Sequence, residues 1–184
     1  VDSDDILALK EIPRSLTVVG AGVIGLEYAS VFAVLGVEVT IVETKKDILP
    51  FVDKEIIEAL LFELRSLGVT IRLGEEVQSV ARREDNRVIT CLRSGKKIVS
   101  DIVLISSGRQ GATSDLNLDL AGITPDEQGK IKVNANYQTS VPNIYAVGDL
   151  IGFPGLASTA MRQGRLAMSH AFGLQDTSLE VPLP

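Results

Sequence analysis

The sequence predicts an α/β fold in which a parallel β-sheet is flanked by helices and carries a small β-meander. Short apolar runs at residues 16–20, 37–43 and 69–73 alternate with two longer patterns that have the periodicity of helices. Three short runs of alternating polar and apolar residues follow the third apolar run. Strands that alternate with helices belong to βαβ units, whose strands run parallel, whereas short consecutive strands joined by tight turns pair antiparallel.

The two helices are expected at residues 23–35 and directly after Asp53, which is a good N-cap. Gly36 lies where the first helix must end, because glycine readily adopts the left-handed conformation that closes a helix. Six aliphatic residues of the second helix fall on one face, which is expected to pack against the sheet: Ile56, Ile57, Leu60, Leu61, Leu64 and Leu67.

The meander is expected from strands at residues 77–83, 87–93 and 96–99, with tight turns between them. An apolar run at residues 101–106 then predicts a further buried strand of the parallel sheet.

The remainder of the chain has a different pattern. It is rich in loop-forming residues, with a short strand expected at residues 130–133. A further strand is expected to carry Gly148 and Asp149 at its end, and a helix rich in small residues follows at 156–172. The tail, 174–184, is expected to be loop.

A glycine motif lies where the first strand meets the first helix: Gly20, Gly22 and Gly25 have the spacing Gly-x-Gly-x-x-Gly. The first glycine permits a tight turn, the second lets the main chain approach a pyrophosphate, and the third lets the helix pack closely against the strand. The helix N-terminus attracts phosphates, and Glu43 at the end of the second strand can accept hydrogen bonds from both hydroxyls of an adenosine ribose. The motif predicts a Rossmann-like dinucleotide-binding unit; the alternative is an ordinary βαβ turn without a ligand.

Composition excludes several classes of function. The 184 residues carry a net charge of −6 and no long basic stretch, so nucleic acid and anionic membrane are not expected as partners. No apolar run reaches the roughly 18 residues that a membrane span needs. Cys91 is the only cysteine, which excludes an internal disulfide and favours a cytoplasmic protein. No metal site is expected, and both ends of the sequence are interpreted as cuts through a longer polypeptide.

Three motifs in a fixed order carry a resemblance to a known family. The glycine motif is followed by an apolar strand that ends in Gly108-Arg109, and later by the run Asn143-Ile144-Tyr145-Ala146-Val147-Gly148-Asp149. These motifs resemble the middle part of the FAD-dependent pyridine nucleotide-disulfide oxidoreductases, which include dihydrolipoamide dehydrogenases, glutathione reductases and soluble pyridine nucleotide transhydrogenases. Residues 107–111 and 139–158 are most similar to the transhydrogenase branch, and Gly111 stands where the disulfide reductases usually have proline.

The resemblance implies a Rossmann-like, three-layer FAD/NAD(P)-binding fold and a division of the chain. Residues 1–14 would be a linker from the FAD domain, residues 15–107 the NAD(P)-binding Rossmann domain, and residues 108–184 the returning half of the FAD-binding domain. The rest of the FAD domain and a C-terminal dimerisation domain would lie elsewhere in the same polypeptide. The expected cofactors are FAD, NAD and NADP, and the full-length protein is expected to form a homo-oligomer.

The resemblance also assigns residues to the nicotinamide nucleotide. Its pyrophosphate and nicotinamide side would lie against one run of residues: Gly20, Ala21, Gly22, Val23, Ile24, Gly25, Leu26 and Glu27. Glu43 would hold the adenosine ribose, Val77 would contact the adenine, and Gly108 would pass close to the nicotinamide. Judged without the resemblance, Val77 is a core residue, and Glu27 is equally an acid that stabilises a helix N-terminus.

A second set of residues is assigned to FAD. Asp149 would hydrogen-bond the ribityl chain. Arg109 is also expected to bind a cofactor, without being assigned to FAD or to the nicotinamide nucleotide. Main-chain N–H groups at a helix N-terminus would face the flavin ring, from Gly155, Leu156, Ala157 and Ser158. The simpler interpretations are a surface charge for Arg109 and a helix cap for Asp149. No catalytic residue is expected here, because the family's catalytic His-Glu pair would lie in the C-terminal domain.

The function implied by the resemblance is hydride transfer between NADH and NADP through FAD, with the isolated segment inactive. One alternative is the NAD-binding part of a dihydrolipoamide dehydrogenase-like disulfide reductase, which would carry a Cys-x4-Cys pair in its preceding part. Another is a non-catalytic NAD-binding module. Glu43 favours the free 2′-hydroxyl of NADH, whereas Lys45 and Lys46 either reach the 2′-phosphate of NADPH or belong to a solvated loop.

Overall fold

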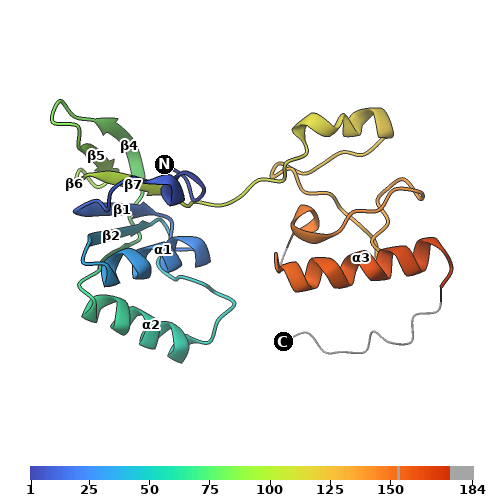
Figure 1. Ribbon diagram of the computed structural model, residues 1–184, viewed down its shortest axis with the longest axis horizontal. Helices are drawn as coiled ribbons and strands as arrows, with labels where there is room; N and C mark the ends of the chain where they lie inside the picture. The colour runs from blue at the N-terminus through green and yellow to red at the C-terminus, as the bar shows by residue number, and fades with distance from the viewer. Residues whose placement is uncertain (153, 175–184) are drawn as a thin grey trace. The chain divides into compact units, whose positions relative to one another are not determined.

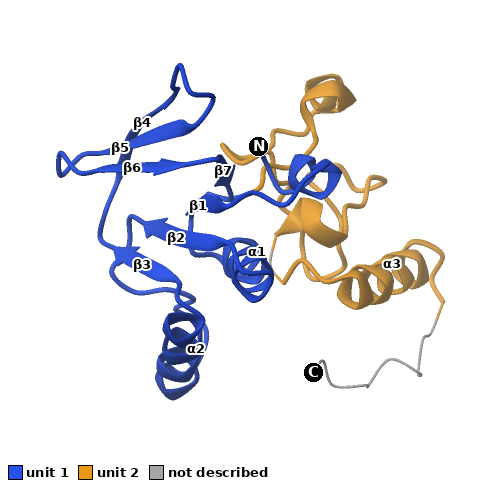
Figure 2. Cartoon of the chain, turned by 60° about the vertical axis from the view of Figure 1, so that its left-hand side comes forward, with its two compact units in different colours: residues 1–108 blue, residues 109–184 orange. Residues whose placement is uncertain are grey.

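The computed structural model describes residues 1–152 and 154–174, so most of the expected tail at 174–184 lies outside the described residues. The chain divides into two compact units, residues 1–108 and residues 109–184 (Figure 2).

The first unit contains a four-stranded parallel sheet with the strand order β3-β2-β1-β7. Its strands are β1 Ser15–Val19, β2 Glu38–Glu43, β3 Thr70–Leu73 and β7 Ile102–Ile105. Two crossover helices connect the first three strands, α1 Val23–Val34 and α2 Lys54–Ser66, and Figure 1 shows both on one side of the sheet. The alternating strands and helices confirm the α/β prediction, with boundaries within one or two residues of those expected from the sequence.

The two central strands, β1 and β2, are largely buried on both faces, which explains why they are nearly continuous apolar runs. Leu16 and Val18 of β1 face the helices and pack in one core with Leu26 of α1 and Leu64 of α2. Thr17 points to the opposite face, where its hydroxyl lies 2.9 Å from the Ser100 hydroxyl. The helices therefore cover one face of the sheet, and the residues around Ser100 cover part of the other.

The predicted meander is a separate antiparallel sheet with the order β4-β5-β6. Its strands are β4 Val77–Arg82, β5 Val88–Leu92 and β6 Lys97–Ser100. Cys91 lies half-buried in β5 and is a free thiol. The chain thus enters the meander from the end of β3 and leaves it into β7, the edge strand of the parallel sheet.

Helix ends follow the sequence signals. The Asp53 carboxylate accepts a hydrogen bond from the Glu55 N–H at 3.0 Å, which confirms the predicted N-cap of α2. Gly36 follows α1 with a φ of 84°, a left-handed conformation that most other residues adopt only with strain. A short 3₁₀ helix, η1 Asp5–Ala8, precedes β1 and contributes the buried Ile6 to the core.

The second unit has a small core around Ile123, Ile131 and Ala146. Its described residues, 109–152 and 154–174, contain three 3₁₀ helices, η2 Ser114–Leu116, η3 Leu118–Ala121 and η4 Gly148–Ile151, followed by the helix α3 Ala157–Ala171. The prediction of α3 is confirmed to within one residue at each end.

Two predicted strands of the second unit are wrong. Residues 130–133 and the segment leading to Gly148 form no strand, and one isolated bridge joins Gln138 to Tyr145. A strand requires a ladder of hydrogen bonds to a neighbour. Here the backbone donors reach isolated partners instead, as when the Ile131 N–H donates to the carbonyl of Leu150 in η4 at 2.9 Å.

None of the helices within residues 1–152 and 154–174 is both long and apolar enough to cross a membrane. The same described residues contain no cluster of histidine, cysteine or acidic side chains that could hold a metal ion.

The packing of α1 against β1 generates a test of stability. Gly25→Ala should lower the free energy of unfolding by about 1–3 kcal/mol, because the new Cβ would overlap the Gly20 carbonyl oxygen and force the helix away from the strand. Gly22→Ser is the matched control, since open space surrounds Gly22 and serine is a favourable N-cap. Urea unfolding followed by circular dichroism measures both, and equal destabilisation of the two variants would contradict this account of the packing.

Candidate functional site

The glycine motif forms a close junction between β1, α1 and the end of β7. Gly20 has a φ of 103°, and a Cβ placed on it would lie 2.6 Å from the Ser106 carbonyl oxygen. A Cβ on Gly25 would overlap the Gly20 carbonyl oxygen and lie 2.6 Å from the Ser106 hydroxyl. That hydroxyl donates to the Val19 and Gly20 carbonyls at 3.0 and 3.1 Å. Glycine is therefore required at both positions for steric reasons.

Gly22 differs from the other two glycines because nothing lies within 4 Å of where its Cβ would be. It is the N-cap of α1, and no side chain caps this helix end. The first N–H groups of α1 therefore lack intrahelical partners, and the helix dipole adds a partial positive charge at this place. The open space, the uncapped helix end and the absence of a side chain fit an anionic pyrophosphate.

Glu43, at the end of β2, is held against the glycine turn. Its carboxylate accepts hydrogen bonds from the Ala21 N–H at 2.8 Å and the Lys45 N–H at 2.9 Å. Burial raises the pKa of Glu43, but these amide hydrogen bonds and one from the Thr44 hydroxyl outweigh burial and lower the pKa below 4.5. The carboxylate is ionised at neutral pH, and its remaining lone pairs can accept further hydrogen bonds.

A cavity of about 310 Å³ lies at the carboxyl ends of the parallel strands. Twelve residues line it: Val19, Gly20, Gly22, Val42, Glu43, Thr44, Lys45, Glu75, Val77, Ser106, Ser107 and Gly108. Clefts at this edge of an open α/β sheet are the usual ligand sites of such folds. The cavity brings together five residues that the sequence analysis assigned to the nicotinamide nucleotide: Gly20, Gly22, Glu43, Val77 and Gly108.

Other residues of the predicted nucleotide set do not line this cavity: Ala21, Val23, Ile24, Gly25, Leu26 and Glu27. Ala21 is buried and contributes its N–H to Glu43, and Leu26 belongs to the core between helix and sheet. Glu27 is exposed on α1. Ala21 and Leu26 thus contribute to the junction and the core rather than to the cavity wall.

Sequence reasoning missed several of the lining residues. Glu75 follows β3, Thr44 follows β2, and Ser106 follows β7. Lys45, which the sequence analysis considered for the 2′-phosphate, also lines the cavity. Their shared signal is position, because each comes within two residues of the end of a parallel strand. A search of the residues after every predicted strand end would have found them.

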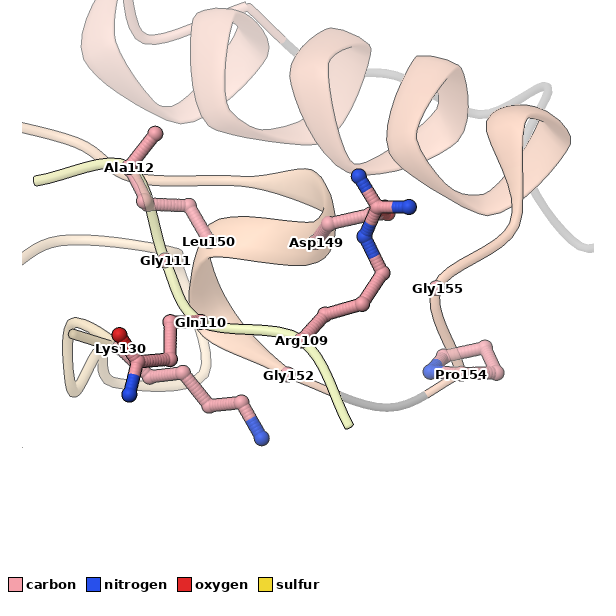
Figure 3. A pocket seen from close by; sticks show the side chains of 10 residues that line it. All are labelled: Arg109, Gln110, Gly111, Ala112, Lys130, Asp149, Leu150, Gly152, Pro154 and Gly155. Carbon is pink, nitrogen blue, oxygen red and sulfur yellow. The ribbon is translucent and has the colours of Figure 1, made fainter. Parts of the chain in front are cut away.

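A second cavity, of about 570 Å³, lies within the second unit. Ten residues line it: Arg109, Gln110, Gly111, Ala112, Lys130, Asp149, Leu150, Gly152, Pro154 and Gly155 (Figure 3). It therefore contains Asp149 and Gly155, which the sequence analysis assigned to FAD, and Arg109, which it expected to bind a cofactor. Leu156, Ala157 and Ser158 do not line it. Figure 3 shows Gly155 on the segment that enters α3.

The start of α3 also lacks a side-chain cap. Leu156 is its N-cap and provides no side-chain hydrogen bond, and η4 has none either, so Asp149 caps neither helix. The Gly148 N–H donates to the Gln163 side-chain oxygen at 2.6 Å, which fastens the turn before Asp149 to α3. At the other end of α3, the His170 ring lies 2.9 Å from the Tyr145 hydroxyl. An uncapped helix end beside a carboxylate and two cationic side chains fits a ligand with hydroxyl and anionic groups.

A family model described as pyridine nucleotide-disulphide oxidoreductase matches residues 1–164. Curated relatives named soluble pyridine nucleotide transhydrogenase are 55% identical over 94% of the chain in Mycobacterium bovis and 51% identical over 91% in Colwellia psychrerythraea. The chain spans 37% and 36% of the length of these two relatives.

Solved structures support the same grouping. The HOCl-induced flavoprotein disulfide reductase RclA from Escherichia coli is 35% identical, with a TM-score of 0.88 over 97% of this chain and 40% of its own. LpdA from Mycobacterium tuberculosis is 30% identical, with a TM-score of 0.88 over 96% of this chain and 38% of its own. On the match of the family model and the similarity of these relatives, the chain belongs to the pyridine nucleotide-disulphide oxidoreductase family.

Proposed function

We propose that this chain is the central NAD(P)-binding part of an FAD-dependent oxidoreductase that transfers hydride between NADH and NADP. The observation that carries the proposal is the cavity at the strand ends of the first unit, where the glycine turn, an uncapped helix N-terminus and Glu43 lie together. The names of the relatives support the choice of transhydrogenase within the family.

Each residue has a physical role in this proposal. The N–H groups at the start of α1 bind the pyrophosphate, and Gly22 leaves room for it. Glu43 accepts hydrogen bonds from the adenosine ribose while its bond to the Ala21 N–H keeps it in place. Val77 offers an apolar surface to the base, and Gly108 lies at the end of the cavity assigned to the nicotinamide.

In the same proposal, residues 15–107 are the NAD(P)-binding domain and residues 108–184 the returning half of the FAD domain. Asp149 binds the ribityl chain of FAD, and the main-chain N–H groups entering α3 from Gly155 hold the flavin ring. The flavin supplies the hydride-transfer chemistry, and the residues of this chain orient and hold the two nucleotides. The full-length protein would be a cytoplasmic homo-oligomer, and the isolated chain would be inactive.

The second candidate is a disulfide reductase of the same family. The 35% identity to the disulfide reductase RclA favours it. Reduced flavin in such an enzyme passes electrons to a cysteine pair, and Cys91 is the only cysteine here. A Cys-x4-Cys pair in the part of the full-length protein that precedes this chain would decide for the reductase. A hydride-transfer assay between NADH and an NADP analogue would decide for the transhydrogenase.

The first prediction concerns the pyrophosphate site. Gly22→Val should abolish NADH binding to the 184-residue chain, because the side chain would fill the space that the pyrophosphate needs, while its Cβ has no other part of the protein within 4 Å. Isothermal titration calorimetry measures the affinity. Gly164→Val is the control, since Gly164 is also surrounded by open space but lies in α3 of the second unit. Equal NADH affinity in wild type and Gly22→Val would contradict the proposed site.

The second prediction concerns nucleotide choice. Glu43, whose lowered pKa keeps it ionised at neutral pH, repels a 2′-phosphate, so the chain should bind NADH more tightly than NADPH at neutral pH. Replacing Lys45 and Lys46 together by alanine should weaken NADPH binding by about two- to tenfold and leave NADH binding unchanged. Added salt should also weaken NADPH binding more steeply than it weakens NADH binding. Lys54→Ala, an exposed change at the start of α2, is the control, and unchanged NADPH affinity in the double variant would assign the two lysines to the solvated surface.

A further inference from the structure

The order of the residues along the proposed nucleotide cavity follows from the strand order of the sheet. The strand order β7, β1, β2, β3 places the end of β7 beside that of β1, then the end of β2, then that of β3. Cavity-lining residues follow each of these strands, with Gly108 after β7, Gly20 after β1, Glu43 at the end of β2 and Glu75 after β3. A dinucleotide with its pyrophosphate at Gly20 and its adenosine ribose at Glu43 therefore continues toward the end of β3, where its base lies.

Glu75 occupies this end of the cavity. Its N–H donates to the Glu43 carbonyl at 3.0 Å, so the main chain of Glu75 is fixed directly beside the residue assigned to the ribose. The Glu75 side chain is 13% exposed, and Val77 lines the same part of the cavity. The base would thus meet one apolar side chain and one carboxylate.

The Glu75 carboxylate is held in place by a lysine whose side chain is largely exposed to solvent. Its Oε1 accepts a hydrogen bond from Lys96 Nζ at 2.6 Å, and the Lys96 side chain is 58% exposed. The hydrogen bonds from Lys96 and from Ser94 hold the pKa of Glu75 below 4.5. An ionised carboxylate only accepts hydrogen bonds, so this end of the cavity attracts a donor and repels an acceptor.

We propose that Glu75 selects the base of the dinucleotide by accepting a hydrogen bond from the exocyclic N6 amino group of adenine. The inference rests on the proposed function, since it needs a dinucleotide bound along the strand ends. Adenine carries a donor at this position, whereas hypoxanthine and guanine carry a carbonyl oxygen there. The lone pairs of that oxygen would face the Glu75 carboxylate with no hydrogen-bond donor between the two groups.

The test compares NADH with reduced nicotinamide hypoxanthine dinucleotide, which has a carbonyl oxygen in place of the N6 amino group and a hydrogen on the neighbouring N1. Titration calorimetry on the wild-type 184-residue chain should give an affinity for the hypoxanthine analogue that is at least about tenfold weaker. In Glu75→Gln the amide can donate as well as accept, so the two ligands should bind within about twofold of one another.

Glu76→Gln is the matched control. Glu76 is the next residue in the chain, lies outside the cavity lining and pairs with Arg93 at 2.9 Å, with its side chain 43% exposed. This variant should keep the roughly tenfold discrimination of the wild type. A folded Glu75→Gln variant that keeps the discrimination would overturn the inference.

The wild-type comparison needs no substitution and remains decisive if Glu75→Gln fails to fold. Equal binding of NADH and the hypoxanthine analogue by the wild type would overturn the selection by Glu75 and leave the proposed function standing. Failure of the wild type to bind NADH at all would overturn the proposed function and this inference with it.

Discussion

A close contact between backbone segments positions the cavity at the strand ends of the first unit. The first turn of α1 lies against the ends of β1 and β7, with no room for a side chain at Gly20 or Gly25. The Ser106 hydroxyl joins the two strand ends by donating to the Val19 and Gly20 carbonyls. This contact brings the uncapped N-terminus of α1 over the strand ends, where Glu43 is fixed by the Ala21 N–H. A larger residue at Gly25 would push the N-terminus of α1 away from Glu43.

The fold of the first unit was predictable because burial and turns leave clear signals in its sequence. Leu16, Val18 and Ile41 lie in continuous apolar runs and are buried on a two-sided sheet. The second unit was less predictable. Ile131 is buried and apolar, which suggests a strand, but strand formation depends on a neighbouring ladder that no local pattern reveals.

The residues of the candidate site that belong to a sequence motif were predicted. Those that are marked only by their position after a strand were missed. The spacing of Gly20, Gly22 and Gly25 with Glu43 points to one cavity, and the structure places three of these four residues on its wall. The hydrogen bond from the Ala21 N–H to Glu43 joins segments that are far apart in the sequence, so it could not be read from either segment. Glu75 belongs to no motif, and it gains importance only from the strand order that puts β3 next to β2.

The central claim is that a nicotinamide nucleotide lies along the carboxyl ends of the parallel strands. The most direct measurement is the change in amide chemical shifts of the ¹⁵N-labelled chain on addition of NAD. The account predicts that the largest shifts occur at the cavity-lining residues Gly20, Gly22, Lys45 and Glu75. Shifts confined to α2 or to the second unit, with the amides of Gly20 and Gly22 unchanged, would contradict it.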